Sequence, residues 1–241
     1  MDETAVEGAK DIPYEIPNLL VDWQMAPAGV PCLWWRSVGH SHSAFVVETF
    51  IDQLAHVAGR DPFDFRRALL AKSPRHKRVL EFVADKAGWG TPPAAGLGRG
   101  IAVHESFGSF VAHVVEAAVS KEGRVRVHRI VAAVDCGPVV NPDTVHAQLE
   151  GAAVFALSAA LYGEISFEHG RVKQGNFNDY PMLRMNEMPE VETHIIPSQE
   201  RMGGVGEPGV PPVAPALANA IFAVTGRRVR RLPIRAEHLK T

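Results

Sequence analysis

One loop of the sequence places a carboxylate where it could move a proton. Glu207 lies between Gly203 and Gly209 in a run rich in glycine and proline, shortly before an apolar segment. Glycines let the backbone approach a ligand closely, and prolines stiffen it. A rigidly held carboxylate suits a general base, because proton transfer depends on precise positioning. The alternative is an ordinary solvated loop carboxylate, which the spacing alone does not exclude.

A second set of candidates surrounds a predicted helix start. Asp135-Cys136-Gly137 ends a predicted strand, and Asn141-Pro142 opens a long apolar segment that contains Gln148 and Glu150. A helix N-terminus can hold a phosphate or a polar ring, but simple capping is the better interpretation of Asn141. Polar side chains on a buried helix need partners. For Gln148 and Glu150 a nearby backbone group is favoured over a ligand.

Two further chemistries have weaker support. His40 and His42 are metal-ligand types two residues apart, but no third ligand follows at a convincing spacing, so zinc is not expected. Ser106, His113 and Asp135 are the residue types of a hydrolytic triad. The sequence lacks the Gly-x-Ser-x-Gly turn that exposes such a serine, so a serine hydrolase is the least favoured interpretation.

Helices are predicted on both sides of these candidates. Three short ones occupy roughly residues 43–88, with Asp61-Pro62 and Ser73-Pro74 as two of their starts. The longest runs from Asn141-Pro142 to about residue 162 and is apolar almost all round, which predicts a buried central helix. A last helix over 214–225 follows the Glu207 loop.

The remaining elements are predicted strands. Residues 100–120 are expected to form one strand that turns at Gly123 and pairs with 124–134. A second hairpin joins 165–168 to 172–174, and 191–196 forms a further strand. The expected fold class is therefore α+β, with short N-terminal helices and mixed or antiparallel hairpins packed on a long buried helix.

Length and composition limit the possible functions. The 241 residues suffice for a large core, and we expect an extended, proline-rich arm or linker over 1–31 and one domain over 32–241. The formal net charge of −2 offers no reason to expect nucleic acid as a partner. No apolar stretch is long enough to span a membrane. The acidic N-terminus does not look like a secretory signal, and the compartment stays open.

Several of these segments, in this order, resemble one family. The segments 135–137, 141–142 and 148–151 resemble the D-x-G, N-P and G-Q-x-E-G motifs of the large molybdenum-binding subunit of the xanthine dehydrogenase and aldehyde oxidase family. Residues 204–208 are similar to its G-x-G-E-P loop, and Arg36-Ser37-Val38-Gly39 to its R-x-x-G segment. Residues 98–108 and 178–184 resemble one branch of that family, the β-subunits of isoquinoline 1-oxidoreductase.

The resemblance implies a function for the candidates. Glu207 would be the general base in a hydroxylation of an aldehyde or N-heteroaromatic carbon, with water as the source of oxygen. Gln148 would bind the pterin of a molybdenum–molybdopterin cofactor, in its cytosine dinucleotide form. The cofactor would also contact the backbone of two segments, which comprise Arg36, Ser37, Val38, Gly39, Gly204, Val205 and Gly206. No protein side chain is expected to ligate the metal.

The resemblance also implies partners. Full subunits of the family are about three times as long, and their E-M-G-Q-G segment is absent from this sequence, so we expect a split-gene product or a C-terminal fragment that needs an upstream half. The two cysteines, Cys32 and Cys136, cannot ligate an iron–sulfur cluster. A separate [2Fe–2S] subunit is therefore implied, with a flavin or cytochrome subunit as a possible acceptor. The alternative from another class is a non-catalytic half-site.

Overall fold

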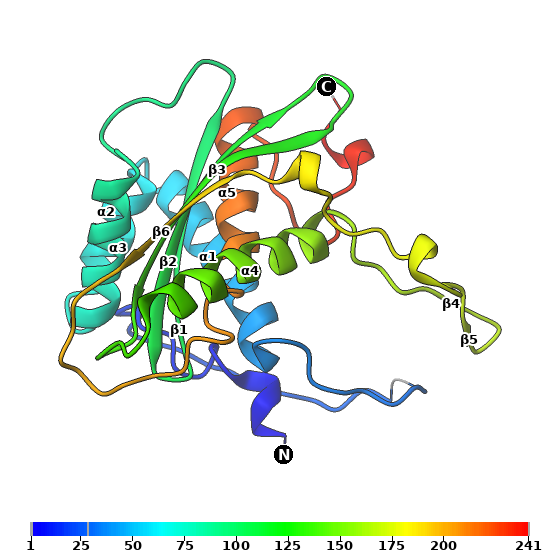
Figure 1. Ribbon diagram of the computed structural model, residues 1–241, viewed down its shortest axis with the longest axis horizontal. Helices are drawn as coiled ribbons and strands as arrows, with labels where there is room; N and C mark the ends of the chain where they lie inside the picture. The colour runs from blue at the N-terminus through cyan, green and yellow to red at the C-terminus, as the bar shows by residue number, and fades with distance from the viewer. Residues whose placement is uncertain (1, 28, 241) are drawn as a thin grey trace.

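A four-stranded mixed sheet forms the centre of the molecule (Figure 1). Its strand order is β1-β2-β3-β6. Strands β1 (Gly98–Ser106), β2 (Ser109–Val119) and β3 (Val125–Asp135) form an antiparallel meander, while β6 (Glu190–Ile195) pairs parallel to β3. The predicted α+β class is confirmed, and the strand expected over 191–196 lies at an edge of the sheet.

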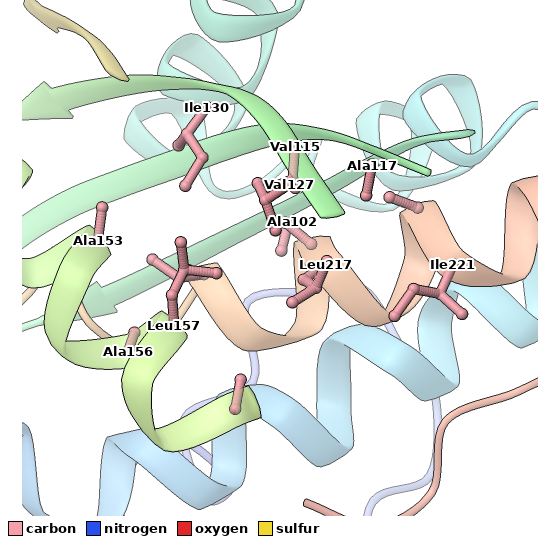
Figure 2. Close-up of a cluster of buried hydrophobic side chains, with 14 of the residues drawn as sticks. Ala102, Val115, Ala117, Val127, Ile130, Ala153, Ala156, Leu157, Leu217 and Ile221 are labelled. Atoms are coloured by element: carbon pink, nitrogen blue, oxygen red, sulfur yellow. The ribbon is translucent and has the colours of Figure 1, made fainter. Parts of the chain in front are cut away.

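Helices cover both faces of this sheet. Because successive side chains of a strand point to opposite faces, Ile101 and Val103 of β1 face one helical layer and Ala102 faces the other. The first layer contains α2 (Pro62–Leu69) and α3 (Pro74–Lys86), and the second contains α4 (Pro142–Leu161) and α5 (Val213–Thr225). Figure 2 shows Leu157 of α4 pointing toward the sheet, within the buried cluster that also contains Leu217 of α5.

The helix α1 (Val38–Val57) lies beside β1 and against α5. The computed structural model describes residues 2–27 and 29–240. Residues 1, 28 and 241, which belong to the arm and the domain expected from the sequence, lie outside the described residues. Among the described residues, no helix combines the length and the apolar character needed to cross a membrane.

The first half of the expected arm packs on the body. A short 3₁₀ helix, η1 (Glu3–Val6), contacts α1, and Tyr14 is buried with its hydroxyl donating to Glu48 Oε1 over 2.5 Å. The described residues of 17–27 and 29–35 have no regular secondary structure. They expose several large apolar side chains, namely Leu19, Leu20, Met25, Leu33 and Trp34. The boundary at residue 31 stays a prediction.

A second segment projects from the body between α4 and β6 (Figure 1). It carries the predicted small hairpin, shortened to β4 (Phe167–Glu168) and β5 (Arg171–Val172), and two 3₁₀ turns, η2 (Phe177–Asp179) and η3 (Met185–Glu187). The hairpin turns at His169 and Gly170, which both have positive φ. A final 3₁₀ turn, η4 (Ala236–His238), follows α5.

The single strand predicted over 100–120 is wrong. The chain reverses at Phe107 and Gly108, with φ values of 53° and 75°, so that β1 and β2 form a hairpin. Two successive positive φ values are typical of the tight turn that matches the twist of paired strands. The sequence hides this turn, because a bulky phenylalanine occupies a position where Asn, Asp or Gly usually stands.

Three smaller expectations are also corrected. Helix α1 begins at Val38 rather than at Ser43, in a stretch whose apolar spacing does not indicate a helix. Ser73 does not cap α3 with its side chain, because its Oγ donates to the carbonyl of Pro13. Helix α4 is not buried all round: Glu150 and Gly151 are exposed, and burial is confined to the face that meets the sheet and α5.

Candidate functional site

Three segments that are far apart in the sequence meet at one corner. The backbone N–H of Ser37 donates to Glu207 Oε1 over 2.9 Å, and the Ser37 Oγ donates to the Glu207 carbonyl over 2.7 Å. Arg36 donates from Nε and Nη2 to the carbonyl of Gly206, and its Nη2 also reaches Gln148 Oε1 over 3.1 Å. The structure therefore brings together Arg36, Ser37, Gln148 and the Glu207 loop.

Arg36 links two elements of this corner. Its guanidinium lies 5.4 Å from the centroid of the Phe155 ring on α4, and the Trp35 ring lies 4.7 Å from the same ring. Burial lowers the pKa of Arg36, and the negative charge of Glu207 opposes that shift. An arginine with planar, directed donors suits such a bridge between a loop carbonyl and a helix side chain.

The turn that presents Ser37 has an uncommon backbone. Ser37 and Val38 have φ values of 76° and 48°, and Ser37 is completely buried. A β-branched residue with positive φ is an outlier whose cost must be met by surrounding contacts. The contacts with Glu207 supply part of that compensation, so the turn and the carboxylate fix each other.

The Glu207 loop is held from both sides. At its start, Gly203 N–H donates to the Cys136 carbonyl and Gly204 N–H to the Phe107 carbonyl, while Ser109 Oγ donates to Gly204 O. Two glycines are required by close packing. A Cβ at Gly203 would lie 2.4 Å from the backbone of the β1–β2 turn, and one at Gly209 would lie 2.8 Å from a methyl group of α4.

Part of the loop stays accessible. Gly204 and Gly206 are exposed, Val205 and Glu207 are half-buried, and a Cβ at Gly206 would meet no atom within 4 Å. Within the part of the chain that the structure describes, Glu207 Oε2 has no hydrogen-bond partner. One carboxylate oxygen is thus held by the backbone of Ser37, and the other makes no hydrogen bond to the described residues.

The two candidate metal-binding histidines have separate partners. His40 Nδ1 lies 2.9 Å from His104 Nε2, and His42 Nε2 lies 3.3 Å from the carbonyl of Ala5. Burial lowers the pKa of His40, and burial together with the nearby His40 and His76 lowers the pKa of His104 to about 3. No cluster of three His, Cys, Asp or Glu side chains that could bind a metal occurs in residues 2–27 and 29–240.

The residues of the hydrolytic alternative do not form a triad. Asp135 is ion-paired with Arg75 over 2.9 Å. Burial would raise the pKa of Asp135, but hydrogen bonds from Arg75 and Ser198 outweigh it and hold the pKa below its ordinary value. Both ring nitrogens of His113 and the Ser106 Oγ are buried without a partner among the described residues. The contacts that would activate a serine are therefore missing there.

The remaining candidates have structural surroundings. Asn141 Oδ1 accepts from the backbone N–H groups of Asp143 and Thr144, so capping is confirmed. Glu150 is exposed on α4. Cys136 is buried, and burial raises the pKa of its thiol. Sequence reasoning missed Phe155, whose contact with Arg36 depends on helix packing and leaves no local signal.

Comparisons with known proteins point to one family. A family model described as a molybdopterin cofactor-binding domain matches residues 82–189. The chain is 34% identical to the beta chain of isoquinoline 1-oxidoreductase from Brevundimonas diminuta over 93% of its length, and 35% identical to a nicotinate dehydrogenase subunit from Pseudomonas putida over 95%. The chain belongs to the xanthine dehydrogenase and aldehyde oxidase family of molybdopterin-binding subunits.

This chain spans a minor part of those relatives. It covers 29% of the Brevundimonas diminuta protein and 21% of the Pseudomonas putida protein. Its fold is shared with quinoline 2-oxidoreductase from Pseudomonas putida 86, with a TM-score of 0.75 over 85% of this chain and 52% of that one. An aldehyde oxidoreductase from Desulfovibrio desulfuricans matches with a TM-score of 0.72 over 86% of this chain and 41% of that one. At 11% and 14% identity these likenesses concern the fold alone.

Proposed function

We propose that this chain is the base-bearing part of a molybdenum hydroxylase that oxidises an aldehyde or an N-heteroaromatic compound with oxygen derived from water. One observation carries the proposal. Arg36, Gln148 and Glu207, which lie far apart along the chain, meet in a single hydrogen-bonded corner. A solvated loop carboxylate would need none of these contacts.

The residues at this corner fit one side of a pterin. The accessible backbone of Gly204, Val205 and Gly206 leaves room for a flat ring, because no Cβ stands at either glycine. Gln148 is half-buried and its Oε1 accepts from Arg36, while its amide nitrogen donates to none of the described residues and could bind a ring of the cofactor. The turn from Arg36 to Gly39 closes the same corner. These residues would hold the cofactor, which supplies the two-electron redox chemistry when bound.

Glu207 would accept the proton of the attacking oxygen. Ser37 holds Oε1 and the main-chain carbonyl of the same residue, which fixes the direction of the carboxylate and leaves Oε2 to act. General-base catalysis requires hydrogen-bond reach from a defined position. Arg36 serves as a positioning residue, since its bonds to Gly206 keep the loop against α4.

The proposal extends to partners. We assign the cofactor as molybdenum–molybdopterin in its cytosine dinucleotide form, and the onward electron path to a [2Fe–2S] cluster on a separate subunit, followed by a flavin or cytochrome subunit. The cysteines support only the assignment of the cluster: Cys32 is exposed and Cys136 is buried, a pair that offers no cluster site on this chain. The rest of the molybdenum subunit would close the corner from the open side.

Substitution of the base tests the assignment. The chain is co-expressed with the rest of the subunit, and Glu207→Gln is expected to lower turnover of an N-heteroaromatic or aldehyde substrate by roughly 10²–10⁴-fold at unchanged molybdenum content. Glu200→Gln, an exposed carboxylate in the same loop region, is the matched control and should keep full turnover. Full turnover of Glu207→Gln with molybdenum bound would show that another group is the base.

The second candidate is a half-site that does no chemistry alone. Leu33 is 92% exposed and Trp34 is 71% exposed directly before Arg36, so this side of the corner is open and apolar. Metal analysis of the purified chain by itself separates the two functions. Molybdenum that stays bound to the isolated chain favours a self-sufficient site, and its absence favours a half-site that gains cofactor only in the assembled subunit.

A further inference from the structure

The two edge strands of the central sheet, β1 and β6, differ in whether their outward backbone groups have hydrogen-bond partners. At the β1 edge, the N–H of Val103 donates to Glu48 Oε2 over 3.1 Å, and the carbonyl of Ile101 accepts from Asn219 Nδ2 over 3.2 Å. Side chains from α1 and α5 thus satisfy backbone groups that would otherwise invite another strand. Proteins commonly cover sheet edges in this way, because an open edge is a template for strand addition.

The β6 edge has no such cover. Among the described strands, β6 is hydrogen-bonded to β3 alone. The N–H of Ile196 donates to Val134 O of β3 over 2.8 Å. Because the backbone polar groups of alternate residues point to opposite sides of a strand, those of Thr193 and Ile195 point away from β3.

A groove follows this open edge. It has a volume of about 770 Å³ and runs along residues 193–199, facing the end of α3 and the start of α4. Phe82 and Val139 give it apolar walls, while Lys86 adds an ammonium group and His146 an imidazole. No carboxylate lines the groove among the described residues. The groove therefore suits an extended peptide that carries an apolar side chain and an acidic one.

We propose that an extended segment from the remaining part of the molybdenum subunit adds to β6 as a fifth strand. The chain spans 29% and 21% of two full-length relatives, so most of such a protein lies outside it and is available to supply that strand. The added strand pairs with the outward backbone groups of Thr193 and Ile195, and it directs a carboxylate toward Lys86. This inference rests on the proposed function, which includes that part of the subunit as a partner.

Residue-resolved hydrogen exchange tests the pairing. Amide exchange of uniformly labelled chain is measured alone and in complex with the rest of the subunit, expressed as a separate polypeptide and isolated by co-purification. We expect the amides of Thr193 and Ile195 to slow at least tenfold in the complex, while those of Glu192 and His194, already bonded to β3, change little. Unchanged exchange at Thr193 and Ile195 in a formed complex overturns the inference and leaves the proposed function standing.

Two other outcomes of this experiment are informative. Failure of any complex to form contradicts the proposed partner, and with it the inference. Protection of Thr193 and Ile195 in the isolated chain that increases with its concentration would assign the edge to a second copy of the same chain, which also overturns the inference. Both results are read from the same spectra and from the oligomeric state by light scattering.

Matched variants test the contacts separately. Ile195→Pro removes an outward N–H without removing a bond to β3, and we expect it to weaken association with the rest of the subunit roughly tenfold, whereas Ile195→Val should associate normally. Lys86→Glu should weaken association several-fold, and Lys77→Glu, on the same helix outside the groove, should not. Thermal unfolding of each variant shows that it is folded. Normal association of folded Ile195→Pro and Lys86→Glu contradicts the inference.

Discussion

The two edges of the sheet differ in whether their backbone groups have partners: the outer groups of β1, the closed edge, are bonded to helix side chains, whereas those of β6 are open in the described part of the chain. At the closed edge, α1 and α5 contribute Glu48 and Asn219 to backbone groups of β1. The same two helices begin at the candidate site: α1 follows Ser37 directly, and α5 follows the Glu207 loop. The closed edge therefore helps to position the site, whereas the β6 edge pairs with β3 alone among the described strands and otherwise packs against α4.

The closed edge depends on buried charges. Glu48 is 1% exposed and accepts from Tyr14, Val103 and Arg66, and Arg66 is fully buried. Burial opposes the charged form of Arg66, but Glu48 and its neighbours raise the pKa of the guanidinium above its ordinary value. A buried pair of this kind contributes little compared with apolar packing, yet the loss of one partner is costly. The comparison teaches that the β1 edge, which carries the candidate site, is held rigidly by buried charges and therefore tolerates substitution of those charges poorly.

The largest effect is expected from breaking the buried pair. Glu48→Ala removes the nearer of two carboxylates paired with the buried Arg66, leaves Asp52 at 3.7 Å, and frees the N–H of Val103, so the free energy of unfolding should fall by about 3–5 kcal/mol. Chemical denaturation measures this change. Glu81→Ala, a partly exposed carboxylate on α3, is the control and should have little effect. An equal loss in both variants would show that the closed edge has no special role.

A pair of proline substitutions compares the two edges directly. Val103→Pro removes the N–H that donates to Glu48 and forces a ring against buried neighbours. The free energy of unfolding should therefore fall by about 3 kcal/mol or more. Ile195→Pro removes a donor that points away from β3, a position where strands tolerate proline, and should cost much less. The midpoints of urea unfolding give both values. Equal costs would mean that the β6 edge is covered as well.

Between the edges, His113 of β2 is expected to make the core sensitive to acid. It is fully buried, its ring nitrogens have no partner among the described residues, and burial lowers its pKa to about 3. The unfolded chain, with an ordinary histidine pKa near 6.5, binds protons that the folded chain does not. The contribution of the neutral, buried His113 to stability is thus fully present above about pH 6.5. It is lost as the pH falls toward 3, by about 2 kcal/mol at pH 5.

Substitution of His113 isolates this contribution. His113→Leu should raise the free energy of unfolding at pH 7 by about 1–3 kcal/mol, because it removes two unsatisfied polar atoms, and it should flatten the loss between pH 7 and pH 5. His128→Leu, at an exposed position of β3, serves as the control. Melting temperatures of both variants between pH 5 and pH 7 measure how much of the pH dependence comes from His113. A pH dependence that His113→Leu leaves intact would point to other histidines, such as His104.

The smallest effect is expected at the site itself. Ser37→Ala removes the buried hydrogen bond to the Glu207 carbonyl but keeps the backbone N–H on Oε1, so the free energy of unfolding should fall by about 1 kcal/mol. Ser120→Ala, in an exposed turn, is the control. Urea unfolding measures both. A loss far above this value would place the corner among the main stabilising features of the closed edge.

Local signals in the sequence predicted many of the elements. Asp61-Pro62 and Asn141-Pro142 start α2 and α4 as expected, because a capping side chain and a proline act within one turn. Gly226 ends α5 in the left-handed conformation. The turn at Phe107 was missed for the opposite reason: the positive φ of this phenylalanine depends on the pairing of β1 with β2 and on the contact of its carbonyl with Gly204, not on a local signal.

The sequence by itself determined which residue types could form the site: a carboxylate in a glycine–proline loop, an amide on a long helix and an arginine before a helix. Only the tertiary structure decided that Arg36 reaches Gly206 across 170 residues and that Ser37 holds Glu207. It also decided which sheet edge is covered and which stays open. Capping and turn preferences act over a few residues, whereas these contacts depend on how distant helices pack against one sheet.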